Sequence, residues 1–565
     1  MEITTKPGLR LEVAGREVRG GRGPEGPRDP GHGRLLYGLP AAVLIVGLLI
    51  PMALTTFAAL DGDIPIAGNF IDVLSDLDAL SAAWHSVLWV GIALVVVAAG
   101  YVIAVLSQVM RWRAPLYFMV LPFGVSALVS GAVFRMIFDP VPERDTVNAL
   151  SGGSTVWLGP EFIWLVLALA FAWTWLGFVV VLFRKGFQET GHSGFLTEGG
   201  RFVLPKPGPV AAIVVLTVLV AAIRVFDLVL ITAPGSVQDD VDVVGLHWWR
   251  MTLRSSDTGR PAALAVLLYV FVAVVTVFGL RSARRLEPAV RRSPPAVAPR
   301  QRTRRPWPSW IIGLLTSAAW LFPIVVLLGT ALHDPVAAGS AGWWRGDGLG
   351  LGSFAAIREA AAVTALFGNV LLACLATALV VATAVPAAYL LTWGALPGWL
   401  SRSATTLLLI LAVAPVQMYL GPLRDMFSRL GWVGSPALLA LVHAMAGLPF
   451  AILVVRTAFL AAPPDLSGKL PAMDAMWRRG RYRPALIAVA VMEFILVWND
   501  FIVGFLIADA GPTPLTLLLW GEARQFGTST GTIAANAILS AVVPVALLLM
   551  TWPRVVAGLT GGVAR

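Results

Sequence analysis

Charged residues are scarce in this sequence. Only 13% of its 565 residues are Asp, Glu, Lys or Arg, whereas 57% are hydrophobic and the mean hydropathy is +0.79. Soluble domains carry roughly 25% charged residues. The composition therefore excludes a soluble globular protein and indicates an integral membrane protein.

Cysteine and the patterns that bind metals or nucleotides are also lacking. The single cysteine, Cys374, lies inside an apolar run, so no disulfide framework exists. The six histidines are scattered without metal-site spacing, and no Gly-x-x-x-x-Gly-Lys-Ser/Thr loop is present to bind phosphates. We predict that the chain is not an enzyme and binds no cofactor or metal.

The chain has instead many apolar runs long enough to cross ~30 Å of hydrocarbon. The first six lie near 36–59, 86–108, 115–138, 162–183, 209–232 and 261–280, and the second six near 309–332, 364–393, 403–421, 436–460, 485–508 and 532–552. We therefore predict an all-α membrane protein with about twelve transmembrane helices in two six-helix halves.

Basic residues are placed asymmetrically around these runs. Seven Lys/Arg lie in 1–34 and nine Arg lie in 281–305, whereas 60–83 carries five Asp and no Lys or Arg. Under the positive-inside rule, both termini and the central linker are cytoplasmic. The net charge of +10 then reflects topology and contact with membrane lipids rather than nucleic-acid binding.

The same features divide the chain into four parts. We predict a disordered basic cytoplasmic tail at 1–34, a first six-helix half at 35–281, a Pro/Arg-rich cytoplasmic linker at 282–308 and a second six-helix half at 309–565. Parallel repeats of this kind are a transporter architecture, with the substrate site near mid-membrane at the interface of the halves.

Short stretches of the second half occur in an order typical of one transporter family. They are Pro415-Val-Gln417, Gly447-Leu-Pro449-Phe450, Val497-Trp-Asn-Asp-Phe501, Pro514-Leu-Thr516 and the Gly-rich end at 558–563. Together they resemble the carbohydrate-type permease subunits of ABC importers, especially the alpha-glucoside/maltose group.

The first half resembles the partner permease subunit of the same importers. The stretches that carry this resemblance are Phe134–Pro140, Trp173–Phe178, Val225–Asp227 and Gly259–Ala265. The resemblance implies a natural fusion of two permease subunits in the type I ABC importer fold. It also implies a sugar importer of the bacterial plasma membrane, moving an alpha-glucoside, disaccharide or oligosaccharide. The implied partners are two ATPase subunits that use ATP and an extracytoplasmic, lipid-anchored sugar-binding protein.

Two elaborate loops, 184–207 and 461–484, join the fourth and fifth spans of each half. In the family, a loop at this place carries a short helix that docks on the ATPase. The matching residues here are Phe202, Leu204 and Pro205 in the first loop, and Pro463, Asp465, Leu466, Met473, Asp474, Ala475 and Trp477 in the second, followed by Arg478 and Arg479. The family's Glu-Ala-Ala is missing and Ala475 replaces its usual Gly. A plain amphipathic surface helix is the alternative reading of each loop.

We look for the substrate path among polar residues inside the spans, because an ionisable group there is costly and usually faces a cavity or a partner. A sugar presents hydroxyl edges and apolar faces, so its site requires amide or carboxylate groups beside an aromatic ring. The candidates are Phe226, Asp227, Asn369, Gln417, Trp498, Asn499 and Asp500. For each Asp, the alternative is a helix cap or an interhelical hydrogen bond.

Two other functions stay open at this point. An ion-coupled secondary transporter requires buried carboxylates in several spans and no paired cytoplasmic loops. An inactive permease-like membrane scaffold is consistent with the loss of the Glu-Ala-Ala from both loops.

Overall fold

The computed structural model of the chain describes residues 32–64, 66–110, 112, 114–189, 205, 207–208, 210–254, 257–291, 308–359, 362–393, 396–461, 482–508, 514–524 and 530–560. Within these ranges the regular structure is helical, and the one pairing of β type is an isolated bridge between His333 and Leu349. The prediction of an all-α fold is confirmed.

The helices follow one another in two long series. Up to residue 291 they are α1 (His32–Leu44), η1 (Ile45–Leu49), α2 (Ile50–Leu60), α3 (Gly68–Ser75), α4 (Leu77–Val109), α5 (Ala114–Val120), η2 (Leu121–Gly124), α6 (Ala127–Ile137), α7 (Thr146–Ser151), α8 (Ile163–Glu189), α9 (Val210–Ile223), α10 (Asp227–Thr232), η3 (Asp239–Val241), α11 (Val244–Arg254) and α12 (Gly259–Arg291). From residue 308 onward they are α13 (Pro308–Ala331), α14 (Pro335–Ser340), α15 (Gly352–Glu359), α16 (Ala362–Trp393), α17 (Gly398–Ala412), η4 (Val416–Met418), α18 (Leu420–Arg429), α19 (Pro436–Ala461), α21 (Arg483–Trp498), α22 (Ile502–Ile507), α23 (Leu515–Ala523) and α24 (Thr530–Thr560).

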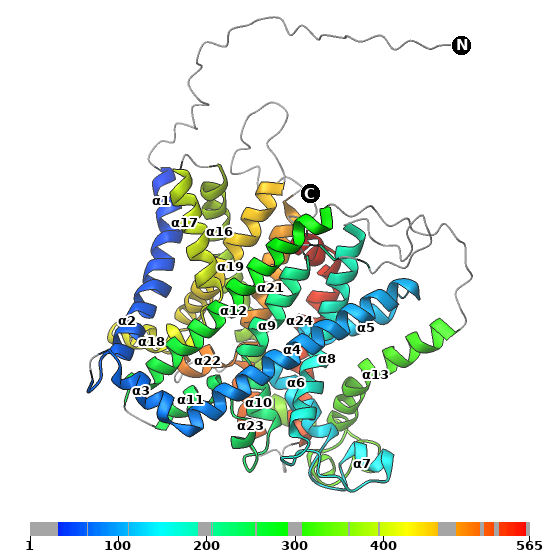
Figure 1. Cartoon of the computed structure of the whole chain (residues 1–565). Helices are drawn as coiled ribbons and strands as arrows, with labels where there is room; N and C mark the ends of the chain where they lie inside the picture. Colours follow the sequence, from blue (N-terminus) through cyan, green and yellow to red (C-terminus); the bar gives the residue numbers. More distant parts are fainter. Residues whose placement is uncertain are drawn as a thin grey trace, which may run out of the picture.

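The long helices form a bundle with two distinct faces (Figure 1). The terminal face is the one at which α1 begins and α24 ends, and the opposite face carries α3, α7, α11 and α23. Eight helices in the described ranges are long and apolar enough to cross a membrane, and one bent pair raises the number to nine. The eight are the continuous α1–η1–α2 helix, α4, α8, α12, α13, α16, α19 and α24. Each coincides with one of the twelve apolar runs of the sequence.

The other four runs are helices interrupted near their middle. In the third run of the first half, α5–η2 and α6 meet at a bend of 111°. The fifth run of that half consists of α9 and α10, whereas the second half has α17–η4 in its third run and α21–α22 in its fifth. The third and fifth spans of both halves are therefore broken.

Local sequence explains three of these breaks. After Pro122 in η2, the hydroxyl of Ser126 accepts a hydrogen bond from Val129 N–H at 3.1 Å and starts α6. Pro415 adopts an extended conformation (φ −71°, ψ 150°) that ends the helical path after α17. Asp500 caps α22. The fourth break is at Phe226, which has φ −148° and ψ −61° without a proline or glycine beside it.

The first helix of each half packs against the other half. The α1 helix contacts α16 and α19, and α13 contacts α5 and α6 as well as α24. Figure 1 shows α1 beside α16 and α17 on one side of the bundle and α13 on the other side. The two halves are therefore interlocked rather than separate bundles lying next to each other.

The predicted four-part division of the chain is only partly covered by the described residues. Because α12 is helical as far as Arg291, the first part of the predicted linker, 282–291, continues the helix. Residues 1–31 and 292–307 lie outside the described residues. The boundaries of the four parts stay predictions.

The α8 helix passes very close to the third span of the first half. A β-carbon at Gly177 would overlap the backbone carbonyl of Met119 in α5, whereas a β-carbon at Gly91 in α4 would have no atom within 4 Å. Only glycine therefore permits this contact between α8 and α5.

We expect Gly177→Ala to lower the free energy of unfolding by about 1–3 kcal/mol, because an added methyl group forces the α8 and α5 backbones apart. The measurement is thermal unfolding of the purified chain in detergent. Gly91→Ala is the matched control and is expected to be neutral, or more stable by roughly 0.5–1 kcal/mol, since alanine favours the helix. Equal unfolding temperatures for Gly177→Ala and the unmodified chain would contradict the close contact.

Candidate functional site

The breaks of the interrupted spans meet inside the bundle. The amide of Asn499, from the fifth span of the second half, donates to the carbonyl of Gly124 in the third span of the first half at 3.3 Å. The rings of Phe226 and Phe501, from the two fifth spans, stack with centroids 6.0 Å apart. Two of the predicted path residues, Phe226 and Asn499, thereby lie at contacts between the halves, with Phe501 and Gly124 as their partners.

Gln417 belongs to the same region. It is buried in η4, and a β-carbon at Gly245 of α11 would lie 3.5 Å from Phe226 Cβ and 3.6 Å from Gln417 Nε2. Gly245 therefore leaves room for an aromatic ring and an amide that come from different halves.

The side chain of Asp500 caps a helix. Its Oδ2 accepts hydrogen bonds from Val503 N–H at 3.0 Å and Gly504 N–H at 3.1 Å, and its backbone carbonyl accepts one from Thr516 Oγ1 at 2.6 Å. His443 Nε2 lies 3.9 Å from the same carboxylate. The helix cap considered from the sequence is thus present, and 17% of the side chain remains exposed.

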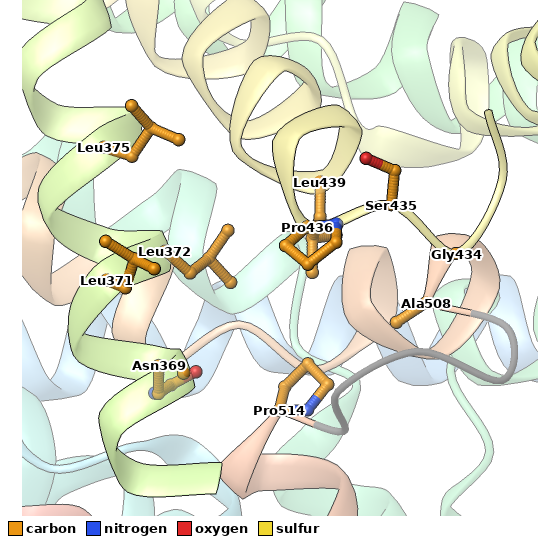
Figure 2. Close-up of a pocket in the computed structure, with 11 residues that line it drawn as sticks. Asn369, Leu371, Leu372, Leu375, Gly434, Ser435, Pro436, Leu439, Ala508 and Pro514 are labelled. Atoms are coloured by element: carbon orange, nitrogen blue, oxygen red, sulfur yellow. The ribbon is translucent and has the colours of Figure 1, made fainter. Parts of the chain in front are cut away.

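Trp498 and Asn369 support this break from behind. The Trp498 indole N–H donates to Ser540 O at 2.8 Å, and Asn369 Nδ2 donates to Trp498 O at 3.2 Å. Figure 2 shows Asn369 at the edge of an apolar groove between α16 and the start of α19, whose other lining residues are Gly368, Leu371, Leu372, Leu375, Gly434, Ser435, Pro436, Leu439, Ala508 and Pro514. Leu371 is 67% exposed there, as expected of a membrane-facing surface. Asn369 therefore contacts the backbone of the break and a lateral groove.

Asp227 is half-buried and is the first residue of α10. It is close enough to Asp500 for the two carboxyl groups to interact electrostatically. Arg224, three residues earlier, interacts electrostatically with Asp500 and with the buried Tyr419. The list of path candidates from the sequence omits Arg224, His443 and Tyr419. Arg224 and His443 could have been found from the sequence, because an ionisable residue inside a span is costly and usually has a functional reason.

An aromatic cluster adjoins the break on the side of α11 and α23. Trp249 of α11 contacts Phe226 at 5.8 Å, Phe505 at 5.6 Å and Trp520 at 6.2 Å between ring centroids. Trp520 of α23 also contacts Phe501 at 5.6 Å. The two short helices that follow the fifth spans thus each contribute a tryptophan, and the rings from both halves fill the space beyond the polar residues.

A buried arginine of the first half, Arg144, forms an ion pair within that half and hydrogen bonds to the second half near α7. Arg144 Nη2 lies 3.0 Å from Asp139 Oδ1, and its Nη1 donates to Gly339 O at 2.8 Å and to Thr530 Oγ1 at 3.2 Å. Burial raises the pKa of Asp139 above its ordinary value, whereas the hydrogen bond from Val141 N–H and the Arg144 cation oppose that rise. One guanidinium therefore fixes a first-half loop to the beginning of α24.

Most of the predicted ATPase-coupling residues cannot be placed in this way. Pro205 is described and buried, and its carbonyl accepts a hydrogen bond from Tyr101 Oη at 2.8 Å. The residues outside the described ranges are Phe202, Leu204, Pro463, Asp465, Leu466, Met473, Asp474, Ala475, Trp477, Arg478 and Arg479. In the part of the chain that is described, no group of three His, Cys, Asp or Glu side chains could hold a metal ion.

Known proteins resemble parts of this chain. No family model matches it. A sulfoquinovosyl glycerol transport system permease protein of Agrobacterium fabrum is 30% identical over 210 residues, which cover 35% of this chain and 71% of that protein. An osmoprotective compounds uptake permease protein of Synechocystis is 28% identical over 270 residues, which cover 44% of this chain and 90% of that protein.

A solved structure is similar as well. In the crystal structure of a bacterial ABC transporter involved in the import of alginate, an acidic polysaccharide, one chain is 17% identical to this one with a TM-score of 0.38. The similarity covers 45% of this chain and 96% of that chain.

We expect Asp500→Ala to lower the free energy of unfolding by about 1 kcal/mol, because two N–H groups at the start of α22 lose their acceptor. Asp500→Asn is the matched control, since its Oδ1 still accepts from Val503 and Gly504 N–H. Thermal unfolding in detergent compares the two variants. The same loss of stability in both would show that the carboxylate does not act as a cap.

Proposed function

The chain belongs to the carbohydrate-type permeases of ABC importers, and on this premise we propose that it moves a sugar into the cell along a path between its two halves. The sugar is an alpha-glucoside, a disaccharide or an oligosaccharide. The energy comes from two separate ATPase subunits docked on loops 184–207 and 461–484, and ATP is used by these partners. An extracytoplasmic, lipid-anchored binding protein delivers the sugar.

The observation that carries this proposal is the meeting of four broken spans at one place between the halves. Phe226 and Phe501 stack there, and Gln417, Asn499, Asp227 and Asp500 surround them with amide and carboxyl groups. Aromatic faces beside such groups suit the alternating apolar and hydroxyl surfaces of a sugar. We therefore assign the substrate path to Phe226, Asp227, Gln417, Trp498, Asn499 and Asp500, with Asn369 at its border.

The length of the chain supports a fusion of two permeases. The relatives are covered over 71% and 90% of their own lengths, yet they account for only 35% and 44% of this chain. The repeated pattern of interrupted third and fifth spans agrees with two units of one plan. The chain lies in the bacterial plasma membrane with both termini cytoplasmic.

In this proposal the ATPases act as a clamp. Closure of the ATPase pair on ATP draws the two coupling loops together and rocks one half against the other. Because α1 and α13 each pack on the opposite half, rocking requires each of these helices to move or bend together with the half that it packs against. The aromatic cluster of Phe226, Trp249, Phe501, Phe505 and Trp520 then separates when the path opens toward the binding protein.

An ion-coupled secondary transporter fits the described spans less well. Their interiors hold three carboxyl groups, Asp227, Glu493 and Asp500, and all three belong to the fifth spans. A proton or ion relay requires such groups in several spans along the membrane. Here Asp227 and Asp500 interact with each other, and Glu493 lies beside Gly447 of α19, so these groups do not form a series across several spans.

We expect the chain purified from native membranes to retain an ATPase and a binding protein, and this complex in proteoliposomes to take up radiolabelled maltose or trehalose when ATP is enclosed. Uptake should cease with a non-hydrolysable ATP analogue. Uptake driven by a proton or sodium gradient alone would establish the secondary transporter instead. Absence of both the ATPase and any uptake would favour the inactive scaffold.

We expect Trp477→Ala to weaken binding of the ATPase by ~30-fold, since truncation of a tryptophan anchor at an interface costs about 2 kcal/mol. The measurement is the amount of ATPase that co-purifies with the chain in a dilution series. Trp310→Ala is the matched control, because Trp310 is 58% exposed at the start of α13, outside both coupling loops. Equal retention of the ATPase by both variants would exclude Trp477 from the interface.

A further inference from the structure

We propose that Arg224 binds an acidic group of the transported sugar, so that the path prefers an anionic sugar carrying a carboxylate, sulfonate or phosphate over a neutral one. This inference rests on the proposed function and narrows its substrate class.

Arg224 lies deep in the fifth span of the first half. It directly follows α9, whose 14 residues extend about 21 Å from the terminal face at 1.5 Å per residue. A hydrocarbon core is about 30 Å thick. The Arg224 backbone is therefore well inside the membrane rather than at its terminal-face boundary.

The side chain of Arg224 is nevertheless exposed, whereas its neighbours Ile223 and Val225 are 1% and 8% exposed. A guanidinium exposed to lipid tails at this depth is costly, so an exposed one is expected to face a water-filled space. The charge of Arg224 acts on Tyr419 and Asp500, which belong to the second half. Both observations direct Arg224 toward the path between the halves.

The guanidinium of Arg224 has unused hydrogen-bond donors. The Arg224 backbone N–H donates to Val220 O at 3.1 Å, but among the side-chain hydrogen bonds and ion pairs of the described residues none involves its guanidinium, which carries five N–H donors. Asp500, the acidic group on which it acts, is occupied by the N–H groups of Val503 and Gly504. The path thus contains a fixed cation whose donors are not used by the folded chain.

Arg224 and its neighbours can each contact a different part of an acidic sugar: the acidic group, the hydroxyl groups and the apolar face. A planar guanidinium matches the two oxygens of a carboxylate, sulfonate or phosphate with two parallel hydrogen bonds. Asp227 lies three residues later, and its carboxyl group makes no hydrogen bond or ion pair with a described residue, so it is placed to accept hydrogen bonds from sugar hydroxyls. Phe226, between them, presents its ring to the apolar face of a sugar.

The test compares two ligands that differ in one group. Sulfoquinovosyl glycerol carries a sulfonate where glucosyl glycerol carries a hydroxyl. Each is titrated into the purified full-length chain in lipid nanodiscs, and binding is followed by tryptophan fluorescence, because Trp249 and Trp498 adjoin the path. We expect the unmodified chain to bind the sulfonate sugar at least about tenfold more tightly than the neutral one, as is typical of hydrogen bonds to a charged group.

Arg224→Gln should remove this preference and leave the affinity for glucosyl glycerol within about twofold of the unmodified chain. Arg224→Lys is the matched control, which keeps the charge but not the planar pair of donors, so an intermediate preference is expected. Equal binding of the two sugars by the unmodified chain would overturn the proposal, as would an unchanged preference in Arg224→Gln or binding of neither sugar. ATP-driven uptake of a neutral sugar by the assembled transporter remains a separate measurement, so loss of the anion preference leaves the importer assignment intact.

Discussion

The constraint that organises this protein is that a backbone polar group in hydrocarbon must find a partner within the protein. Eight long helices satisfy this requirement by themselves. The four interrupted spans cannot, and their breaks occur where other groups supply partners: Ser126 for α6, Asp500 for α22, Asn499 for Gly124 O, and Asn369 for Trp498 O. The breaks therefore gather in the interior. In the described part of the chain, the same polar groups that satisfy the backbone are also the ones that the proposed substrate path offers to a polar substrate.

The two halves use a shared plan with different side chains. Both break their third and fifth spans, and both follow the fifth span with a short helix that contributes a tryptophan, Trp249 or Trp520, to one aromatic cluster. At the fifth-span break, however, the first half has Arg224 and Asp227, whereas the second half has Asn499 and Asp500. In the proposed path, unequal halves can hold an asymmetric molecule in one orientation, whereas two identical halves would offer it two equivalent orientations.

Hydropathy alone was sufficient to predict the helical class and the positions of all twelve apolar segments, because ~20 apolar residues in a row have few alternatives in a membrane. It could not reveal the breaks, because each lies within a run that still averages as apolar. Proline or a capping side chain marks three of them, but Arg224–Phe226 contain neither proline nor glycine. Nor could it show that α1 and α13 pack on the opposite halves, because the hydropathy of a helix is the same whichever half it packs against. Of the path candidates, Phe226, Gln417 and Asn499 meet as a group, whereas Asp500 is already engaged as a cap and Asn369 supports the backbone from the side.

The crossing of α1 and α13 also bears on how the chain is made. A ribosome delivers α5 and α6 long before α13, the helix that covers them, has been translated. Conversely, α1 is inserted in the bilayer before its packing partners α16 and α19 have been translated. The first half cannot reach its final packing as an independent unit, and synthesis of both halves as one polypeptide guarantees that the missing helix follows within the same insertion event. Joining the halves in one chain thus makes their assembly independent of the concentration of a second subunit.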